Sequence, residues 1–104
     1  MASNITMIKK LQRAINNRGE RILYMTSQFY SDDEDRPITL YRIKKAVLDE
    51  KKGRNVNVEL FKSTSQIQIV LFLRDYWYQL NGLEVPRDNE KWEEVKRKYK
   101  EHNG

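Results

Sequence analysis

Hydrophobic positions recur at helical spacing near the start of the chain, between residues 4 and 17. Ile8, Leu11 and Ile15 lie on one stripe of this segment. Polar and charged residues occupy most of the other positions, so the pattern predicts an amphipathic helix with one packed face. Gly19 follows, and a residue without a Cβ suits the left-handed conformation that often ends a helix.

The segment 63–82 is apolar around most of its circumference when it is placed on a helical wheel. Ser63 and Gln66 have the spacing of a capping box, and Asn81–Gly82 is a stop signal. A helix with little polar surface has to be covered by the rest of the chain or by a partner, so the pattern predicts a long, buried central helix. Its polar stripe has three members, Gln68, Asp75 and Gln79.

Three segments between these helices are rich in β-branched and aromatic residues or alternate between apolar and polar residues, which predicts strands. They cover residues 21–31, 38–48 and 56–62. The acidic block Asp32–Asp35, together with Pro37, predicts a loop after the first strand, and residues 51–55 predict a turn before the third. Short connections between consecutive strands predict an antiparallel sheet.

The segment 38–48 also fits a helix, in which Pro37 would lie in the first turn and Lys51–Lys52–Gly53 would end it. A strand is preferred because the residues alternate and because 56–62 provides a hairpin partner. The strand places Thr39, Tyr41, Ile43, Lys45 and Val47 on one face, and Leu40, Arg42, Lys44 and Ala46 on the other. In 56–62 the alternation separates Val56, Val58 and Leu60 from Asn57, Glu59 and Phe61.

Asp88 or Asn89 is expected to open a last, short helix. Its apolar stripe is narrow and should pack on the central helix; it consists of Trp92, Val95 and Tyr99. Two oppositely charged pairs at four-residue spacing support it, Glu93–Arg97 and Glu94–Lys98.

The predicted fold class is therefore α+β, with the order α-β-β-β-α-α: a helix, a three-stranded antiparallel sheet, a long buried helix and a short C-terminal helix. The length of 104 residues suits one domain spanning residues 1–104. Residues 1–3 and 101–104 are expected to be disordered. Met7 is an alternative start of translation.

Composition and charge narrow the functional classes. There are no cysteines, so neither a disulfide framework nor a thiolate zinc site is expected. No segment has the length of a membrane span or the apolar core of a signal peptide, which favours a cytoplasmic protein without a membrane partner. The formal net charge of +5 favours contact with polyanions.

The residues needed for catalysis are sparse, so the chain is not expected to be an enzyme, and no catalytic residue, metal or cofactor is assigned. His102 is the single histidine and lies in the tail, which excludes a histidine-activated nucleophile. The carboxylates of Asp32–Asp35 are contiguous and would diverge from one another. Glu59 and Lys62 resemble half of a nuclease strand motif, but their spacing predicts opposite faces of a strand.

A nucleic-acid-binding surface is the alternative function. Basic side chains gather on the first helix, on one strand face and in the following turn, and convergent positive charge is what phosphate contact requires. The candidate residues are Lys9, Lys10, Arg13, Arg42, Lys44, Lys51, Lys52 and Arg54.

The preferred function is non-enzymatic binding of a protein partner, or formation of a homodimer, through an aromatic surface of the central helix. Successive aromatics surround more than half a turn there, and aromatic residues and arginine are enriched at binding hot spots. The candidate interface residues are Arg74, Tyr76, Trp77 and Tyr78. If the sheet and the last helix cover both sides, no such surface is exposed.

Three short segments give the chain the texture of a known group of proteins: Ser-Gln-Phe-Tyr-Ser at 27–31, Arg-Pro-Ile-Thr at 36–39 and Leu-Phe-Leu-Arg-Asp at 71–75. In this texture it resembles small uncharacterised proteins of Gram-positive phages and mobile elements. The resemblance implies an accessory protein that acts by binding.

The helix–three-strand–helix order over residues 4–82 is similar to that of the double-stranded-RNA-binding domain. That family carries a lysine cluster where this chain has Ser63-Thr64-Ser65-Gln66. Its first hairpin loop enters a minor groove, whereas the corresponding loop here is Asp32-Asp33-Glu34-Asp35, which phosphates repel. The resemblance therefore extends to the topology and not to duplex binding.

Overall fold

The computed structural model describes residues 3–86 and 90–103, with side chains up to Lys98. The helices and strands follow the predicted order α-β-β-β-α-α. Their bounds are α1 Asn4–Asn16, β1 Ile22–Ser31, β2 Arg36–Asp49, β3 Arg54–Ser63, α2 Gln66–Leu80 and α3 Glu90–Asn103. Ser3 is the N-cap of α1, and residues 101–103, expected to be disordered, belong to α3. The predicted opening of α3 at Asp88 or Asn89 lies outside the described residues.

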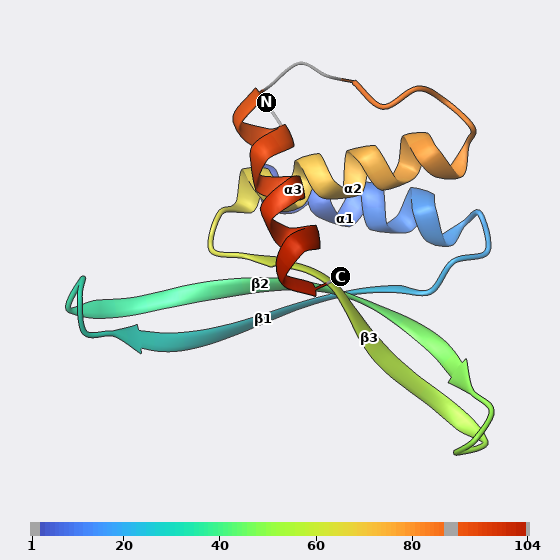
Figure 1. The fold of residues 1–104 in the computed structure, drawn as a ribbon, viewed down its shortest axis with the longest axis horizontal. Coiled ribbons are helices and arrows are strands. Elements are labelled where there is room, and N and C mark those ends of the chain that lie inside the picture. The colour runs from blue at the N-terminus through green and yellow to red at the C-terminus, as the bar shows by residue number, and fades with distance from the viewer. Residues whose placement is uncertain (1–2, 87–89, 104) are drawn as a thin grey trace.

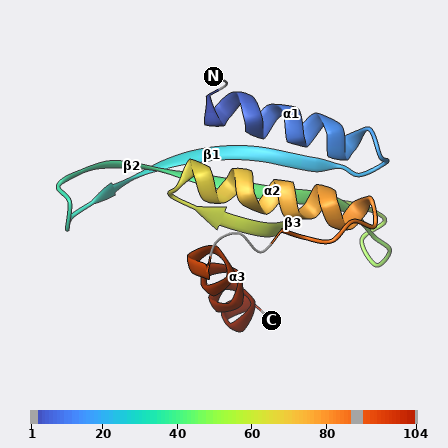
Figure 2. The ribbon, with the colours of Figure 1, turned by 90° about the horizontal axis from the view of Figure 1, so that it is seen from above.

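The three strands form one antiparallel sheet in the order β1-β2-β3. Figure 1 shows α1 and α2 side by side on one face of this sheet. Figure 2 shows the molecule turned by a right angle. α3 lies beyond β3, at the edge of the sheet opposite to the edge where α1 lies. The hairpin of β1 and β2 extends past the helices as an arm (Figure 1).

The segment 38–48 is a strand, as preferred, and β2 is longer than predicted because Pro37 belongs to it and not to the loop. Pro37 lies opposite Tyr30 of β1, whereas β3 pairs with β2 only between Tyr41 and Asp49. On the side of β3, Pro37 therefore has no neighbouring strand that would need its missing N–H group.

The core lies between the sheet and helices α1 and α2, and α3 adds Trp92 to it. All three strands contribute to it, and the predicted stripe of α1 supplies Ile8 and Ile15. The buried hydrophobic residues are Ile8, Ile15, Ile22, Ile43, Phe61, Ile69, Leu73 and Trp92. Gly19 has the expected positive φ of 97° after α1. The β2 face that was predicted to carry Tyr41 and Ile43 points to the helices. Ile43 is buried there, and Tyr41 stacks with Tyr24 at 6.4 Å between ring centroids.

The predicted alternation in β3 holds from Val56 to Glu59 but is wrong for Leu60 and Phe61 because of a β-bulge. Phe61 pairs with Ile43, but the next pair is Glu59 with Lys44, so Leu60 has no partner on β2. This extra residue shifts the outer half of β3 by one position. Phe61 therefore shares the helix-covered face with Val56 and Val58, while Glu59 lies on the opposite face.

α2 is covered less completely than its sequence suggests. Ile69 and Leu73 are fully buried, most other apolar residues of the helix are half-buried, and Ile67 is 51% exposed. The capping box predicted for Ser63 and Gln66 does not form. Ser63 Oγ instead accepts from the Ser65 N–H at 3.0 Å, and Gln66 donates its side-chain amide to the Tyr41 hydroxyl at 2.7 Å.

The end of α2 follows the prediction. Gly82 has a φ of 69°, and the N–H groups of Gly82 and Leu83 donate to the carbonyls of Gln79 and Tyr78 at 3.1 and 2.9 Å. These two bonds form a Schellman motif, in which a residue without Cβ turns the chain out of the helix.

Asp75, which the sequence places on a polar stripe, is buried at 3% exposure. Its Oδ2 accepts from Trp92 Nε1 at 2.9 Å and from Lys96 Nζ at 2.8 Å, and Arg74 donates to Oδ1 at 3.1 Å. A buried carboxylate is tolerated only when it is paired and hydrogen-bonded, as it is here. The Asp75 carboxylate therefore attaches α3 to α2.

The apolar side of α3 is packed in the core as predicted, but its ring contact is with β3, and α2 is reached through the Asp75 carboxylate. Trp92 meets Phe61 edge to face at 5.7 Å between ring centroids, and Val95 packs against the core. The Tyr99 side chain lies outside the described part. The Glu94–Lys98 pair forms at 3.4 Å, but Glu93 pairs with Lys96 at 3.1 Å rather than with Arg97, because Asp75 holds Lys96 on that side.

Replacing Trp92 tests this attachment. Trp92→Phe keeps a ring in the core and removes one donor to a buried carboxylate, so the free energy of unfolding should fall by about 1–3 kcal/mol. Trp92→Ala should cost about 3–5 kcal/mol, because it also leaves a cavity. Urea denaturation of the full chain measures both. Lys98→Ala, in an exposed pair, is the control and should change stability by less than about 1 kcal/mol. A Trp92→Phe protein as stable as the wild type would contradict the role of the N–H group.

The pH dependence of the attachment follows from Lys96. Burial lowers its pKa, whereas the hydrogen bonds and charges of Asp75 and Glu93 raise it, and the net pKa lies above the ordinary 10.5. A lysine pKa raised by folding stabilises below the unfolded value and loses its effect as pH rises through the folded value. The stability difference between wild type and Lys96→Met should therefore be constant at neutral pH and shrink above 10.5. Urea midpoints measured across this range check it; a difference that grows above 10.5 would contradict it.

Candidate interaction surfaces

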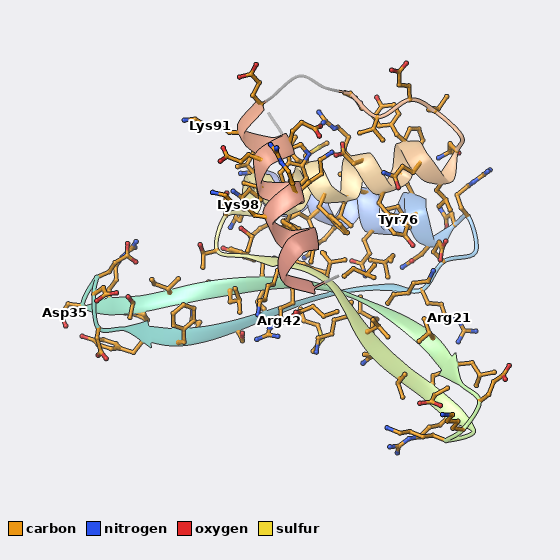
Figure 3. The ribbon with its side chains drawn as sticks, viewed as in Figure 1. Arg21, Asp35, Arg42, Tyr76, Lys91 and Lys98 are labelled. Carbon is orange, nitrogen blue, oxygen red and sulfur yellow. The ribbon has the colours of Figure 1, made fainter. Side chains whose placement is uncertain are left out.

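The face of the sheet that points away from α1 and α2 is called the open face here, because none of the described helices lies on it (Figures 1 and 2). Ile22, Ile43 and Phe61 point to the helices, so the alternating residues of each strand point the other way. Figure 3 shows Arg42 on this side. Two rows of the register define its centre: Leu23–Lys44–Glu59 and Met25–Arg42–Lys62.

The open face carries large apolar side chains exposed to water. Leu23, Met25, Phe29 and Leu48 are 36–65% exposed, and Ile38 and Leu40 lie between them half-buried. Leu40 is opposite Ser27, and Ile38 is opposite Phe29. A single exposed apolar residue needs no explanation, but a continuous series on one uncovered face marks an interaction surface.

The same face is rich in positive charge. Arg42 is paired with Glu59 at 2.8 Å, which is the one carboxylate that the strands place near its centre. Lys44 and Lys62 flank this pair. Arg21 continues the ladder opposite Ala46, since its carbonyl accepts from the Ala46 N–H at 3.0 Å, and the alternation places it on the face of Leu23 and Lys44. The cations therefore exceed the carboxylates around the apolar residues.

Because of the β-bulge, the prediction for Glu59 and Lys62 is also wrong. They were expected on opposite faces of a strand, but they pair with Lys44 and Arg42 respectively, and both lie on the open face. Glu59 is occupied by Arg42. Among the described residues no group of three or more histidine, aspartate or glutamate side chains could hold a metal ion.

The structure divides the eight predicted nucleic-acid-binding residues among three places. Lys9, Lys10 and Arg13 are exposed on α1, in the helix layer. Arg42 and Lys44 are on the open face, at the other side of the sheet. Lys51, Lys52 and Arg54 are exposed at the far turn between β2 and β3, where the Asp49 carboxylate accepts from the N–H groups of residues 51 and 52. The eight residues do not form one continuous surface.

The four predicted interface residues of α2 are half-buried and point in different directions. Arg74 contacts Asp75, beneath α3. The Tyr76 hydroxyl accepts from Lys45 Nζ at 3.5 Å, so Tyr76 leans toward β2. Trp77 packs against the core and meets Tyr78 edge to face at 5.4 Å. An interface through these residues stays a prediction, and they offer less free surface than the open face.

The tip of the β1–β2 arm is acidic. Residues 32–35 are exposed, and the Tyr30 hydroxyl donates to the Asp35 carboxylate. Asp35 has a φ of 51° at the end of the turn, a conformation that aspartate tolerates better than most residues. Arg36, at the start of β2, pairs with Glu34 at 3.5 Å. The positive centre of the sheet and this negative tip therefore lie at different ends of the arm.

Sequence reasoning missed Leu23, Met25 and Phe29 as surface residues. The strand prediction for 21–31 was correct, but apolar residues occur at both parities of that segment. The pattern alone therefore did not show which residues the helices leave uncovered.

Comparisons of the chain with protein-family models, with curated proteins and with solved structures gave no match. Within the described part of the chain, none of the helices is both long and apolar enough to cross a membrane.

Proposed function

We propose that this chain is a non-enzymatic binding protein that holds a protein partner on the open face of its sheet. The observation that carries the proposal is the exposure of Leu23, Met25 and Phe29 on the same uncovered face as Arg42 and Lys62. An apolar patch surrounded by polar groups is the usual composition of a protein–protein interface. The resemblance to accessory proteins of phages and mobile elements agrees with such a role.

The chemistry of the open face defines the partner. The cations outnumber Glu59, so the partner should carry carboxylates around an apolar centre. A face-to-face contact between two identical open faces would bring these cations together, which disfavours it. A different, acidic protein is therefore the preferred occupant.

Two features favour a protein over a nucleic acid. Leu23 and Met25, at the centre of the open face, have no ring on which a base can stack. Phe29, the one aromatic residue that the strands place on this face, lies in the arm toward the acidic tip. In addition, a nucleic acid that followed the arm would approach the carboxylates of residues 32–35, which repel phosphates. Nucleic-acid binding is kept as the second function because of the net charge of +5.

Paired variants test the proposal. The double variant Met25→Ser, Lys62→Glu removes one exposed apolar side chain and reverses one charge on the open face. Its matched control, Ile67→Ser, Lys9→Glu, makes the same two changes at exposed positions of α2 and α1. A partner captured from cells that carry the gene counts only after it has been purified and its affinity measured by calorimetry. The open-face variant should bind at least about tenfold more weakly, equivalent to about 1.4 kcal/mol, and the control should bind normally.

Equal weakening by both variants, or none, would place the contact elsewhere and reject the proposal. The same proteins should be tested for electrophoretic shift of mixed-sequence DNA and RNA at two salt concentrations. A tight complex that dissociates steeply with salt, and that Lys9→Glu or Arg42→Glu weakens, would replace the proposal by nucleic-acid binding.

A further inference from the structure

The outer edge of β1 has none of the features that usually prevent strands from pairing with other chains. β1 runs from Ile22 to Ser31 without a charged residue, a proline or a glycine. Its register with β2 is continuous, so no bulge disrupts it. Charges, prolines and bulges are the means by which proteins protect an edge strand. A ten-residue edge without them is a template for another strand.

The hydrogen bonds show which backbone groups face outward. Ala46 donates to the Arg21 carbonyl, so the odd-numbered residues of β1 pair with β2, and the even-numbered residues point their N–H and C=O groups to the free edge. Ile22 confirms this alternation. Its N–H donates to Asn16 Oδ1 at 2.7 Å, and its carbonyl accepts from Gln12 and Asn16 side chains at 2.9 and 3.1 Å.

The side chains of α1 therefore occupy the edge of β1 at Ile22 and leave the rest of this edge open to another strand. The outward groups belong to Tyr24, Thr26, Gln28 and Tyr30, and no other strand of the described chain pairs with them. In Figure 1 the second half of β1 lies in the arm, beyond the helices. A strand can approach this half without contacting α1 of the same copy, and at the first half α1 holds the backbone groups of Ile22.

The second edge of the sheet is protected. β3 carries Arg54, Glu59 and Lys62, and it contains the bulge at Leu60. α3 also lies beside it, held by the contact of Trp92 with Phe61. The two edges therefore differ, and only β1 is suited to pairing.

We infer that two copies of this chain form a symmetric dimer by antiparallel pairing of their β1 edges, centred on Ser27. This register leaves Ile22 with α1 and pairs residues 24–30 of both copies. Tyr24 then lies opposite the partner's Tyr30, and Met25 opposite the partner's Phe29, the aromatic and apolar cross-strand pairs that stabilise sheets. The carbonyls and N–H groups of Thr26 and the partner's Gln28 bond to each other.

The charges at the ends of the strand agree with an antiparallel arrangement. Beyond Ser31 the chain carries the acidic residues 32–35, and before Ile22 it carries the exposed Arg18 and Arg21. Antiparallel pairing places Asp33 near the partner's Arg21, whereas a parallel pair would place the acidic tips side by side. Opposite charges in contact favour the first arrangement and oppose the second.

The dimer is also closed. Once the β1 edges are paired, the outer strands of the six-stranded sheet are the two copies of β3, which are charged and bulged. The part of β2 that extends past β3, residues 36–40, is also unpaired on that side, but it is short and contains Pro37. Further chains therefore find no suitable edge, and the assembly stops at two. The inferred dimer goes beyond the proposed function and does not depend on it, although it would join the two open faces into one surface.

Light scattering coupled to size-exclusion chromatography tests the dimer with the full chain. The wild type should be a dimer that dissociates on dilution. Thr26→Pro removes an outward N–H without breaking a bond to β2, and Thr26→Lys adds two lysines close to the symmetry axis; each should weaken dimerisation at least tenfold. Asn57→Lys adds the same charge to an exposed position of β3 and should leave the dimer intact. Circular dichroism checks that each variant is folded. If Thr26→Pro does not fold, the result with Thr26→Lys decides whether β1 is the interface.

A cysteine introduced at Ser27 gives a direct test of the register, because the chain has no cysteine of its own. Ser27 and the partner's Ser27 form a pair without mutual hydrogen bonds, with Cα atoms about 4.5 Å apart, within the range that a disulfide spans. Ser27→Cys should therefore form a covalent dimer with oxidised glutathione, and Asn57→Cys should not. A wild type that is monomeric at all concentrations would overturn the inference. So would a dimer that resists both Thr26 variants and is not linked by Ser27→Cys, because its interface would then lie elsewhere.

Discussion

The packing of α1 and α2 on the same face of a three-stranded sheet determines most of what this molecule can do. Side chains alternate along a strand, so burying Ile22, Ile43 and Phe61 beneath the helices forces their neighbours to the other side. In the described chain no helix lies on that side, because α3 packs beside β3. Leu23, Met25 and their basic neighbours are consequently in water, and the surface available for binding follows from the way the core is closed.

A second constraint is the buried carboxylate of Asp75. A single buried acid fixes the position of α3, since it accepts from Trp92 and Lys96 of that helix at the same oxygen. The apolar contacts of Trp92 and Val95 bury hydrophobic surface, whereas the hydrogen bonds fix the orientation of α3. By lying beside β3, α3 also makes the two edges of the sheet unequal, and this asymmetry separates an edge that is free to pair from one that is not.

Much of the fold could be predicted from the sequence where a single local rule applied. Helical spacing found α1, the Asn81–Gly82 signal ended α2, and alternation identified β2 as a strand. The predictions failed where a distant partner decided the outcome. Asp75 looks like a surface residue on a helical wheel because its donors come from another helix, and the bulge at Leu60 has no mark in the local pattern. The candidate site was harder to predict than the fold. Residues such as Lys9 and Arg42 are both positively charged but lie in different layers of the structure. The exposed apolar residues of β1 resemble core residues in the sequence, because only the positions of the helices show which of them are covered.

The bulge at Leu60 has a consequence for how this chain can vary. Because one unpaired residue separates Phe61 from the outer half of β3, the valines at 56 and 58 share the helix-covered side and the asparagines at 55 and 57 face the opposite side. Pairing Leu60 with Lys44 would instead invert the outer half of the hairpin, turning its valines to the open face and its glutamate to the face of the helices. Deleting Leu60 would keep the present register, because Glu59 and Phe61 would then be consecutive residues of a regular strand. A residue added or removed between Val56 and Glu59 would therefore exchange the two faces for the residues beyond it, whereas an insertion in the neighbouring turn would alter neither face.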